Sequence, residues 1–322
     1  MSAPTNTVQK NRILGGLWGS LVGDALGVPV EFIDRDTVQF DPVTSMREFG
    51  THNQPRGTWS DDGAMLLCTT DSLLNHEFNL VDMGNRFLQW MSGGLWTANG
   101  DVFDVGATTS AALRSIAKGT PPDQAGGKHE DNNGNGSLMR ILPVVLRFTN
   151  EPIDVFANHI EKASAITHGH PRSQMACVFY GLVVRQILLG EQPQTAFSSA
   201  RREFTSRYER SAELSRFRSI LDDALPSLSQ REVFSTGYVL HTLHASLWCL
   251  LTTDNYRDCV LKAVNLGGDT DTTGCVVGGL AGVLYGMKSI PADWIQQLAR
   301  KGDVDCLFHK FADVCEENGV EK

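Results

Sequence analysis

The chain has little positive charge relative to its acidic side chains. Its 322 residues include 28 Lys and Arg against 37 Asp and Glu, which gives a net charge of -9 and a pI near 5.5. Proteins that bind nucleic acids or anionic membranes through general electrostatics need a basic surface. The composition therefore argues against such partners, although it remains compatible with one local basic pocket for a phosphorylated ligand.

Long apolar runs and paired cysteines are missing as well. No stretch reaches the roughly 18 uninterrupted apolar residues expected of a membrane span, and Met1 to Lys10 lacks the apolar core of a signal peptide. The seven cysteines are odd in number and contain no CxxC pair. This pattern is typical of reduced, buried thiols rather than of disulfides or a zinc site. We therefore expect a cytoplasmic protein without a membrane anchor.

Alternating apolar and polar runs, the mark of half-buried strands, are scarce, whereas helical spacing of apolar residues is common. The 41% hydrophobic and 20% charged residues are ordinary for a globular protein. We predict a single all-α domain over residues 11–322 after a disordered tail at residues 1–10. The expected helices cover residues 12–28, 65–73, 81–95, 106–117, 152–166, 173–189, 195–207, 211–224, 236–252, 256–266, 272–286, 292–300 and 305–317.

Two long segments between these helices collect Gly, Pro, Asn and Asp, and we predict them to be loops. They run from Ile33 to Trp59 and from Gly119 to Gly136. Structureless loops of this length are uncommon inside a compact helical domain and are usually functional.

Two of the expected helices carry a glycine at every fourth position. A glycine inside a helix costs up to ~1 kcal/mol relative to alanine, so four of them need compensation. Spacing of four places them on one face, where another backbone can come very close. We infer that both helices lie deep in the bundle, each packed tightly against a neighbour that could be the other. Gly27 and Gly286 also suit helix C-termini. The stripes are Gly15, Gly19, Gly23 and Gly27, and Gly274, Gly278, Gly282 and Gly286.

Two Asp clusters each precede a strongly apolar helix. Ser60-Asp61-Asp62 could simply cap its helix, because Ser is a preferred N-cap and Asp suits the positive end of the helix dipole. In Gly267–Gly274, Thr270 or Asp271 could be the N-cap. If the two helices meet in the core, however, four carboxylates converge, and they would repel one another unless protonated or neutralised by a cation. Oxygen donors of this kind favour Mg²⁺, Mn²⁺ or Ca²⁺ over zinc.

A series of motifs runs along nearly the whole chain, from residue 13 to about residue 295. The motifs are residues 13–27 followed by Val30-Glu31-Phe32, then Ser60-Asp61-Asp62, Asp104-Val105-Gly106, Gly134 to Arg140, Thr167-His168 and Gly267 to Gly274. In this order they resemble the motifs of the ADP-ribosylglycohydrolase family, which includes the dinitrogen reductase-activating glycohydrolase.

The resemblance implies an orthogonally packed all-α bundle with a binuclear Mg²⁺ or Mn²⁺ site at its centre. It also implies ADP-ribose as the ligand and hydrolysis of the bond between ADP-ribose and an acceptor side chain. The implied metal ligands are Ser60, Asp61, Asp62, Asp269, Asp271 and Thr272. Ser60 stands where Thr is commoner in the family, but it keeps the hydroxyl.

The resemblance further implies catalytic roles for two carboxylates. Glu31 matches a position near the family's site, where it could place a water or gate entry; otherwise it is a solvated surface residue. Asp104 resembles a residue that assists acid–base chemistry at the ribose; otherwise it caps the helix that starts near Gly106. Ala107 replaces an Asn of some members, which weakens the transfer of arginine specificity.

Substrate contacts are expected from the glycine-containing loop and from two further residues. Backbone amides in such a loop can cradle a diphosphate. His168 could hydrogen-bond a phosphate or hydroxyl, and Tyr238 could stack on adenine, although a lone His or aromatic residue is often structural. The expected substrate-binding residues are Asn135, Gly136, Ser137, Leu138, Met139, His168 and Tyr238.

We therefore predict a monomeric metal-dependent hydrolase that releases ADP-ribose from a modified acceptor, first of all arginine on a protein. Serine, nucleic acid or a small molecule could be the acceptor instead, since acceptor contacts would come from variable loops. A non-catalytic ADP-ribose-binding relative is the alternative of a different class, and the intact Asp clusters argue against it.

Overall fold

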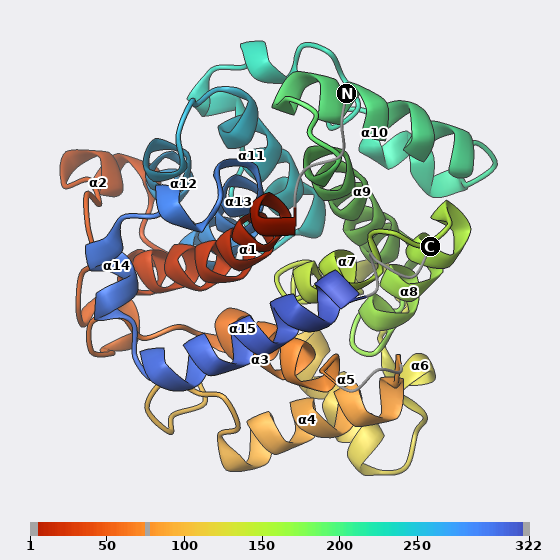
Figure 1. Ribbon diagram of the computed structural model, residues 1–322, viewed down its shortest axis with the longest axis horizontal. Helices are drawn as coiled ribbons and strands as arrows, with labels where there is room; N and C mark the ends of the chain where they lie inside the picture. The colour runs from red at the N-terminus through yellow and green to blue at the C-terminus, as the bar shows by residue number, and fades with distance from the viewer. Residues whose placement is uncertain (1–5, 75–77, 318–322) are drawn as a thin grey trace.

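The computed structural model describes residues 6–74 and 78–317, which form one body of packed α-helices (Figure 1). Within these residues there is no β-strand, only three isolated bridges. The predicted all-α class is confirmed. The α-helices are α1 (Asn6–Gly27), α2 (Arg35–Phe40), α3 (Asp61–Ser72), α4 (Leu80–Gly93), α5 (Ala107–Ala117), α6 (Pro122–Ala125), α7 (Leu142–Phe148), α8 (Ile153–Ala165), α9 (Pro171–Leu188), α10 (Pro193–Arg207), α11 (Val239–Leu251), α12 (Tyr256–Val264), α13 (Thr270–Tyr285), α14 (Ala292–Gln297) and α15 (Lys301–Glu317).

The two predicted loops contain short helical turns. The first carries α2 and a 3₁₀ turn, η2 (Gly50–His52), and the second carries α6 and another, η3 (Glu130–Asn132). Both segments still connect the longer helices, and both supply residues to the pocket region described below.

Two segments differ from the expected helices. The predicted helix 211–224 is wrong, since this segment holds only the 3₁₀ helix η4 (Ala212–Phe217) and turns. Its buried residues Phe217 and Ile220 lie at the end of η4 and in the turn after it, and their spacing of three suits such turns as well as an α-helix. Helix α7 was not expected, because its residues are buried almost all round and show no polar face.

The N-terminal helix starts earlier than the predicted domain boundary at residue 11. Helix α1 begins at Asn6, and Lys10 forms an ion pair with Asp313 on α15. The predicted tail therefore includes residues that are helical, while residues 1–5 lie outside the described part of the chain. By length and composition Val8–Val30 could cross a membrane, with a mean hydropathy of 1.4, but its most apolar window is 100% buried within the protein.

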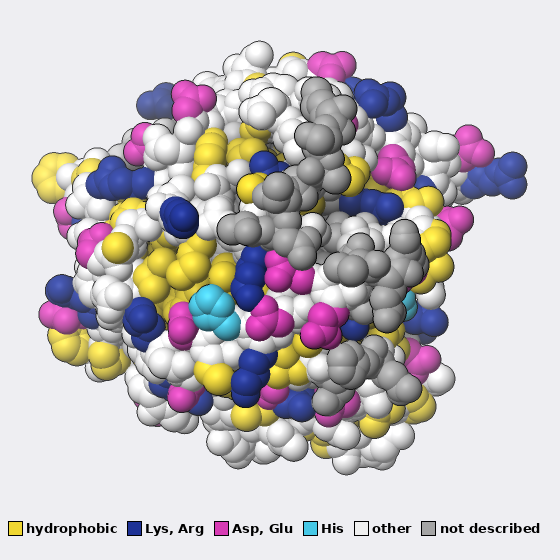
Figure 2. All heavy atoms as spheres, viewed as in Figure 1, with side chains coloured by type: hydrophobic (Ala, Val, Ile, Leu, Met, Phe, Trp, Pro, Cys, Tyr) yellow, Lys and Arg dark blue, Asp and Glu magenta, His cyan; other side chains and the backbone are white. Residues whose placement is uncertain are grey.

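Acidic and basic side chains are interspersed on the face shown in Figure 2. All seven cysteines are unpaired, and only Cys306 among them is exposed, as the cysteine pattern indicated.

The core of the fold is a close contact between α1 and α13, the most extensive helix–helix contact in the described residues. The two glycine stripes face each other in antiparallel order. A Cβ atom built on Gly23 would lie 2.0 Å from the carbonyl oxygen of Gly274, and one built on Gly278 would lie 2.1 Å from that of Gly19. The inferred tight packing is thus correct, and each helix is the other's partner.

Of the two glycines that also suited helix ends, only Gly286 is a cap in the expected sense. It ends α13 with a φ of 79°, in the left-handed region that favours glycine. Gly27 is the last residue of α1 and packs on α13, since an added Cβ would lie 2.4 Å from the Cα of Asp271.

We expect Gly278→Ala to destabilise the protein severely. The added methyl group would meet backbone atoms of Gly19, which can move away only if the whole helix moves, and overpacking of this kind costs about 1–3 kcal/mol or more. Thermal unfolding followed by circular dichroism measures the loss. Gly302→Ala is the matched control, because its added Cβ would meet no described atom within 4 Å beyond the adjoining backbone of its own helix. A Gly278→Ala protein as stable as this control would contradict the close contact.

Candidate active site

Both Asp clusters open onto one pocket of about 270 Å³. Its wall combines Glu31 and Phe32, from the segment that follows α1, with residues of α3, α5 and α13 and of the loops before α7 and α9. Nine of the residues predicted from the sequence are among those that line it: Glu31, Asp61, Asp104, Asn135, Gly136, Met139, His168, Asp269 and Thr272.

The first Asp cluster is held in place by Asp24, a buried residue of α1. The Asp24 carboxylate accepts hydrogen bonds from the backbone N–H groups of Ser60 (3.0 Å) and Gly63 (2.7 Å) and from the Ser60 hydroxyl (3.1 Å). Ser60 is also the N-cap of α3, and its hydroxyl accepts from the N–H of Asp62 at 3.3 Å. The capping interpretation is thus correct for Ser60, and the cap is fastened to the central helix.

The second Asp cluster is brought to the same place by the turn before α13. Gly267 and Gly268 have φ values of 72° and 74°, a conformation that glycine adopts without strain. The N-cap of α13 is Asp269, not Thr270 or Asp271 as expected, and its side chain caps no described backbone N–H. Thr270 instead donates from its hydroxyl to the carbonyl oxygen of Gly27 at 2.9 Å, which fastens this turn to the end of α1.

The carboxylates of the two clusters converge. Oxygen atoms of Asp24, Asp62 and Asp271 lie within 4.8 Å of one another, and so do those of Glu31, Asp269 and Asp271. The Thr272 hydroxyl lies 3.3 Å from Asp62 Oδ1.

Several oxygen atoms in this group lack a hydrogen-bond partner among the described residues. They are buried, so a missing partner costs free energy unless something else binds there. The atoms are Asp62 Oδ2, Asp269 Oδ1 and Asp271 Oδ2.

Burial and mutual repulsion raise the pKa values of the whole group. Burial, followed by the charges of Asp104 and Asp269, raises the pKa of Glu31 to about 9. Burial also raises the pKa of Asp24 to about 7, and those of Asp61, Asp62 and Asp271 lie well above 3.8 for the same reasons. Carboxylates that resist ionisation this strongly would be stabilised as anions by a cation among them.

The donor set therefore fits divalent cations. It consists of carboxylate and hydroxyl oxygens, which suit Mg²⁺ or Mn²⁺, and three buried oxygens have no other described partner. The residues that could hold such ions are Ser60, Asp61, Asp62, Asp269, Asp271 and Thr272, as the resemblance implied.

Glu31 and Asp104 come from different elements and lie close together, with carboxyl oxygen atoms within 4.8 Å of each other. Glu31 is buried, with 2% of its surface exposed, so it is not the solvated surface residue that was the alternative. Its Oε2 is hydrogen-bonded to Nε2 of His52. Asp104 is not a helix cap either, because the N-cap of α5 is Gly106. The φ of Asp104 is 56°, a strained conformation that recurs at functional sites.

The glycine-containing loop contributes only part of what was expected. Asn135 donates from Nδ2 to Asp269 Oδ2 at 2.8 Å, and it lines the pocket together with Gly136 and Met139. Ser137 and Leu138 are buried outside the pocket wall. The Ser137 hydroxyl accepts from Ser164 at 2.9 Å. Leu138 and Ser137 therefore pack the core beneath the loop rather than offering side chains to a ligand.

The buried His168 reaches the pocket beside this loop. Its Nδ1 lies 2.9 Å from the Thr167 hydroxyl, and the opposite edge of its ring lies against Gly136. Burial, together with the charge of Arg140, lowers the pKa of His168 to about 3, so its ring is neutral near pH 7. A neutral imidazole can donate or accept a hydrogen bond but does not pair with a phosphate as a cation.

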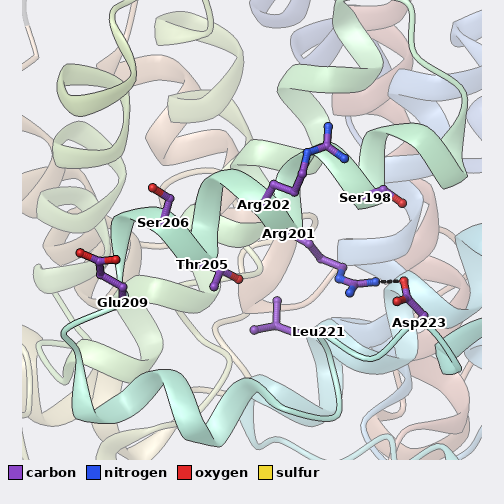
Figure 3. Close-up of a pocket in the computed structure, with 8 residues that line it drawn as sticks. All are labelled: Ser198, Arg201, Arg202, Thr205, Ser206, Glu209, Leu221 and Asp223. Carbon is purple, nitrogen blue, oxygen red and sulfur yellow. Dashed lines mark hydrogen bonds and ion pairs between the residues drawn. The ribbon is translucent and has the colours of Figure 1, made fainter.

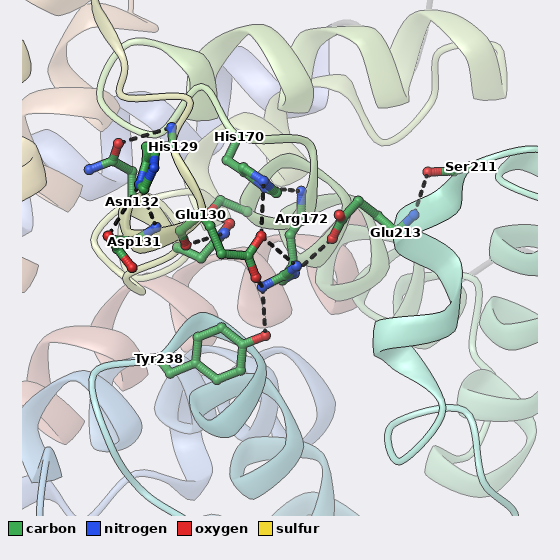
Figure 4. A network of polar contacts seen from close by, with 11 residues as sticks. His129, Glu130, Asp131, Asn132, His170, Arg172, Ser211, Glu213 and Tyr238 are labelled. Carbon is green, nitrogen blue, oxygen red and sulfur yellow. Dashed lines mark hydrogen bonds and ion pairs between the residues drawn. The ribbon is translucent and has the colours of Figure 1, made fainter.

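Tyr238 stands at the N-cap of α11, next to the pocket but outside its wall. A polar network fixes its hydroxyl, as Figure 4 shows. The buried Arg172 donates to Tyr238 Oη at 3.2 Å, to Glu213 at 2.7 Å and to both oxygens of Glu130 at 2.7 and 3.1 Å. Because Glu130 belongs to η3, the network ties the loop 119–136 to α9, to η4 and to Tyr238.

Two residues of the site were missed in the sequence. The local sign of Asp24 is that it is a lone acidic residue in an apolar, glycine-striped segment. His52 lies in a long loop, and nothing in the local sequence places it beside Glu31.

A larger hollow of about 650 Å³ lies elsewhere, between α10 and the segment that holds Leu221 and Asp223 (Figure 3). There Arg201 forms an ion pair with Asp223. The smaller pocket is the better candidate for chemistry, because it gathers the buried carboxylates and the strained backbone of Asp104.

We expect the metal-free protein to lose stability as the pH rises. The pKa values of Asp24 and Asp104 are raised from 3.8 to about 7, and that of Glu31 from 4.5 to about 9. The folded state thus binds these protons more tightly than the unfolded state. The resulting stability is complete below about pH 4 and is lost as the pH rises through about 7 and 9. The melting temperature of chelator-treated protein across this range measures the effect.

The same measurement with Mg²⁺ or Mn²⁺ isolates the contribution of the site. Bound cations would replace the protons, so the melting temperature should rise most at the higher pH values. An identical pH dependence with and without added cations would contradict the assignment of these carboxylates to a cation site.

The comparisons with known proteins agree with this geometry. Residues 5–321 match the sequence profile of the ADP-ribosylglycohydrolase family. ADP-ribosylarginine hydrolase Tri1 of Serratia proteamaculans is 30% identical to the chain, over 92% of this chain and 78% of that protein. ADP-ribosyl-[dinitrogen reductase] glycohydrolase of Rhodospirillum rubrum is 30% identical, over 90% and 91%. A solved structure of an ADP-ribosylglycohydrolase-related protein complex superposes with a TM-score of 0.80 at 30% identity, over 96% of this chain and 99% of that one. The chain belongs to the ADP-ribosylglycohydrolase family.

Proposed function

We propose that this enzyme hydrolyses the glycosidic bond between ADP-ribose and an arginine side chain, with two Mg²⁺ or Mn²⁺ ions as cofactors. The observation that carries the proposal is the convergence of the two Asp clusters on one pocket, with buried oxygens that have no other described partner. Two relatives, each 30% identical, are named for the hydrolysis of ADP-ribosylarginine or of ADP-ribosylated dinitrogen reductase, which supports this substrate class.

The proposed metal ligands are Ser60, Asp61, Asp62, Asp269, Asp271 and Thr272. When bound, such ions supply Lewis acidity, orient ribose hydroxyls and lower the pKa of a water molecule. In the reaction, the oxygen of water bonds to the anomeric carbon of the ribose. The bond from that carbon to the guanidine nitrogen breaks and the nitrogen leaves with the electron pair. The water gives up one proton, and the leaving nitrogen takes one up, so the protons balance.

Two carboxyl groups beside the clusters, those of Glu31 and Asp104, are the proposed acid–base residues. Glu31 would orient the attacking water, with its own carboxyl group held by His52. Asp104 would exchange a proton at the ribose, and its pKa of about 7 suits a group that must accept and give a proton near neutral pH. Nearby carboxylates also stabilise the positive charge that develops on the ribose as the bond breaks.

The remaining predicted residues would hold the ligand. The enclosed volume of about 270 Å³ is below the 300–1,000 Å³ that is usual for whole-ligand pockets, so it suits the ribose end of ADP-ribose. Asn135, Gly136 and Met139 would border the diphosphate, and the neutral ring of His168 would hydrogen-bond a hydroxyl or a phosphate oxygen. Tyr238, held by Arg172, would meet the adenine outside the enclosed part.

Two alternatives remain distinct from this proposal. Serine, nucleic acid or a small molecule could replace arginine as the acceptor without any change in the metal ligands. A non-catalytic ADP-ribose-binding protein would keep the ligand loop but would not need all of Asp61, Asp62, Asp269 and Asp271. The presence of all four favours an enzyme.

The test is the release of free ADP-ribose from arginine-, serine- and nucleic-acid-linked substrates, with Mg²⁺ or Mn²⁺ and with chelator. We expect release from the arginine-linked substrate in the presence of metal and its loss with chelator. Asp269→Asn should lower the rate by about 100-fold or more and reduce the metal content, because it removes one anionic ligand.

The exposed Asp293→Asn on α14 is the control and should behave like the original protein. Tight binding of ADP-ribose without release from any substrate would overturn the enzymatic proposal. Unchanged activity and metal content in Asp269→Asn would overturn the metal assignment.

We also propose that the protein acts in the cytoplasm and as a monomer. The unpaired cysteines support a reducing compartment. The net charge of -9 argues against nucleic acid or an anionic membrane as a partner.

A further inference from the structure

Phe32 is an exposed aromatic residue in the wall of the pocket. It directly follows the buried Glu31, and 66% of its surface is exposed. Its φ is 61°, in the left-handed region that bulky residues rarely adopt. Both the exposed ring and this backbone conformation cost free energy, and such strain tends to persist at ligand sites.

The strained backbone of Phe32 is rigidly held. Its N–H donates to the carbonyl oxygen of Gly268 at 2.7 Å, and the N–H of Gly268 donates back to the carbonyl oxygen of Ile33 at 2.9 Å. Gly268 immediately precedes Asp269, so these bonds fasten Phe32 to the second Asp cluster. The ring is thus exposed on a fixed support, not on a loose loop.

The surroundings of the ring combine aromatic and acidic groups. The centroid of the Phe32 ring lies 6.0 Å from that of His52, at an interplanar angle of 61°, and the His52 ring lies 5.0 Å from that of Phe103. Oxygen atoms of Glu31 and Asp104 and a ring nitrogen of His52 all lie within 4.8 Å of one another. An aromatic face beside two carboxyl groups is the combination that binds a planar cation.

We propose that Phe32 is a specificity-determining residue that stacks on the guanidinium group of the acceptor arginine, beside Glu31 and Asp104. This inference rests on the proposed function and names the part of the site that selects the acceptor. A guanidinium gains both from the ring face and from the carboxyl groups. The uncharged side chain of an acceptor serine would gain neither, so the ring favours arginine over serine.

The same feature explains how arginine can be selected although Ala107 stands where some family members carry Asn. Ala107 lies in the pocket wall but has no polar side chain. The acceptor contact is therefore assigned to the ring of Phe32 on the Glu31 side of the pocket.

The test compares Phe32→Ala, Phe32→Leu and Phe32→Trp on an arginine-linked ADP-ribosyl peptide, with Mg²⁺ or Mn²⁺ present. We expect Phe32→Ala and Phe32→Leu to raise KM about tenfold with little change in kcat, and Phe32→Trp to keep the original KM, because only an aromatic face binds the cation. The inhibition constant of free ADP-ribose should stay unchanged in all three. Phe40→Ala, with a ring that is 93% exposed on α2 outside the pocket, is the matched control.

The outcomes distinguish the proposed role of the Phe32 ring from the proposed enzymatic function. If Phe32→Ala or Phe32→Leu kept the KM of the original protein, the proposed role of the ring would be overturned while the proposed function stands. Equal weakening of ADP-ribose inhibition would also overturn it, because the ring would then contact ADP-ribose itself. If the original protein released nothing from the arginine-linked peptide, the proposed function would fail, and this inference with it.

Discussion

The close contact between the backbones of α1 and α13 is the constraint on which the site depends. Glycines on both helices let the carbonyl oxygens of one approach the Cα atoms of the other, a distance that any side chain would increase. This contact fixes the position of α13 along the axis of α1, so Asp271 lies beside Gly27. The chain that continues from Gly27 then brings Glu31 close to Asp269 and Asp271. Asp24, one turn earlier on α1, then holds the start of α3. One helix thus positions both Asp clusters.

The cost of this arrangement explains its chemistry. Seven carboxyl groups are crowded around a small pocket. Burial raises the pKa values of all seven, and the charges of the other carboxylates raise them further for every member except Asp269. Three of their oxygens have no described hydrogen-bond partner. Repulsion among these carboxylates lowers the stability of the cation-free fold, so stability alone does not explain why they lie together. The same group becomes favourable when cations are bound, which joins the stability of the core to the proposed cofactor.

Outside the carboxylate group, two further sets of contacts hold parts of the site in place. Arg172 and its acidic partners hold the loop 119–136 and Tyr238. Hydrogen bonds with Gly268 hold Phe32 in a strained and exposed position. The first set of residues suits the proposed ADP-ribose, and Phe32 suits the acceptor that is proposed to be cleaved from it.

Local features of the sequence were enough to determine the helical class and the unpaired cysteines, and they marked both Asp clusters as groups of oxygen donors. That the two clusters form one centre was implied only by the family resemblance. The helical spacing of apolar residues and the gathering of oxygen donors both involve residues close together in the sequence, so both can be recognised without knowledge of the fold. Only the tertiary structure decided that Ser137 packs in the core while Asn135 contacts Asp269, that Asp24 caps α3 from another helix, and that His52 meets Glu31. These contacts join residues 21 to 134 positions apart, and their pairing follows from the register of packed helices, which no local pattern encodes.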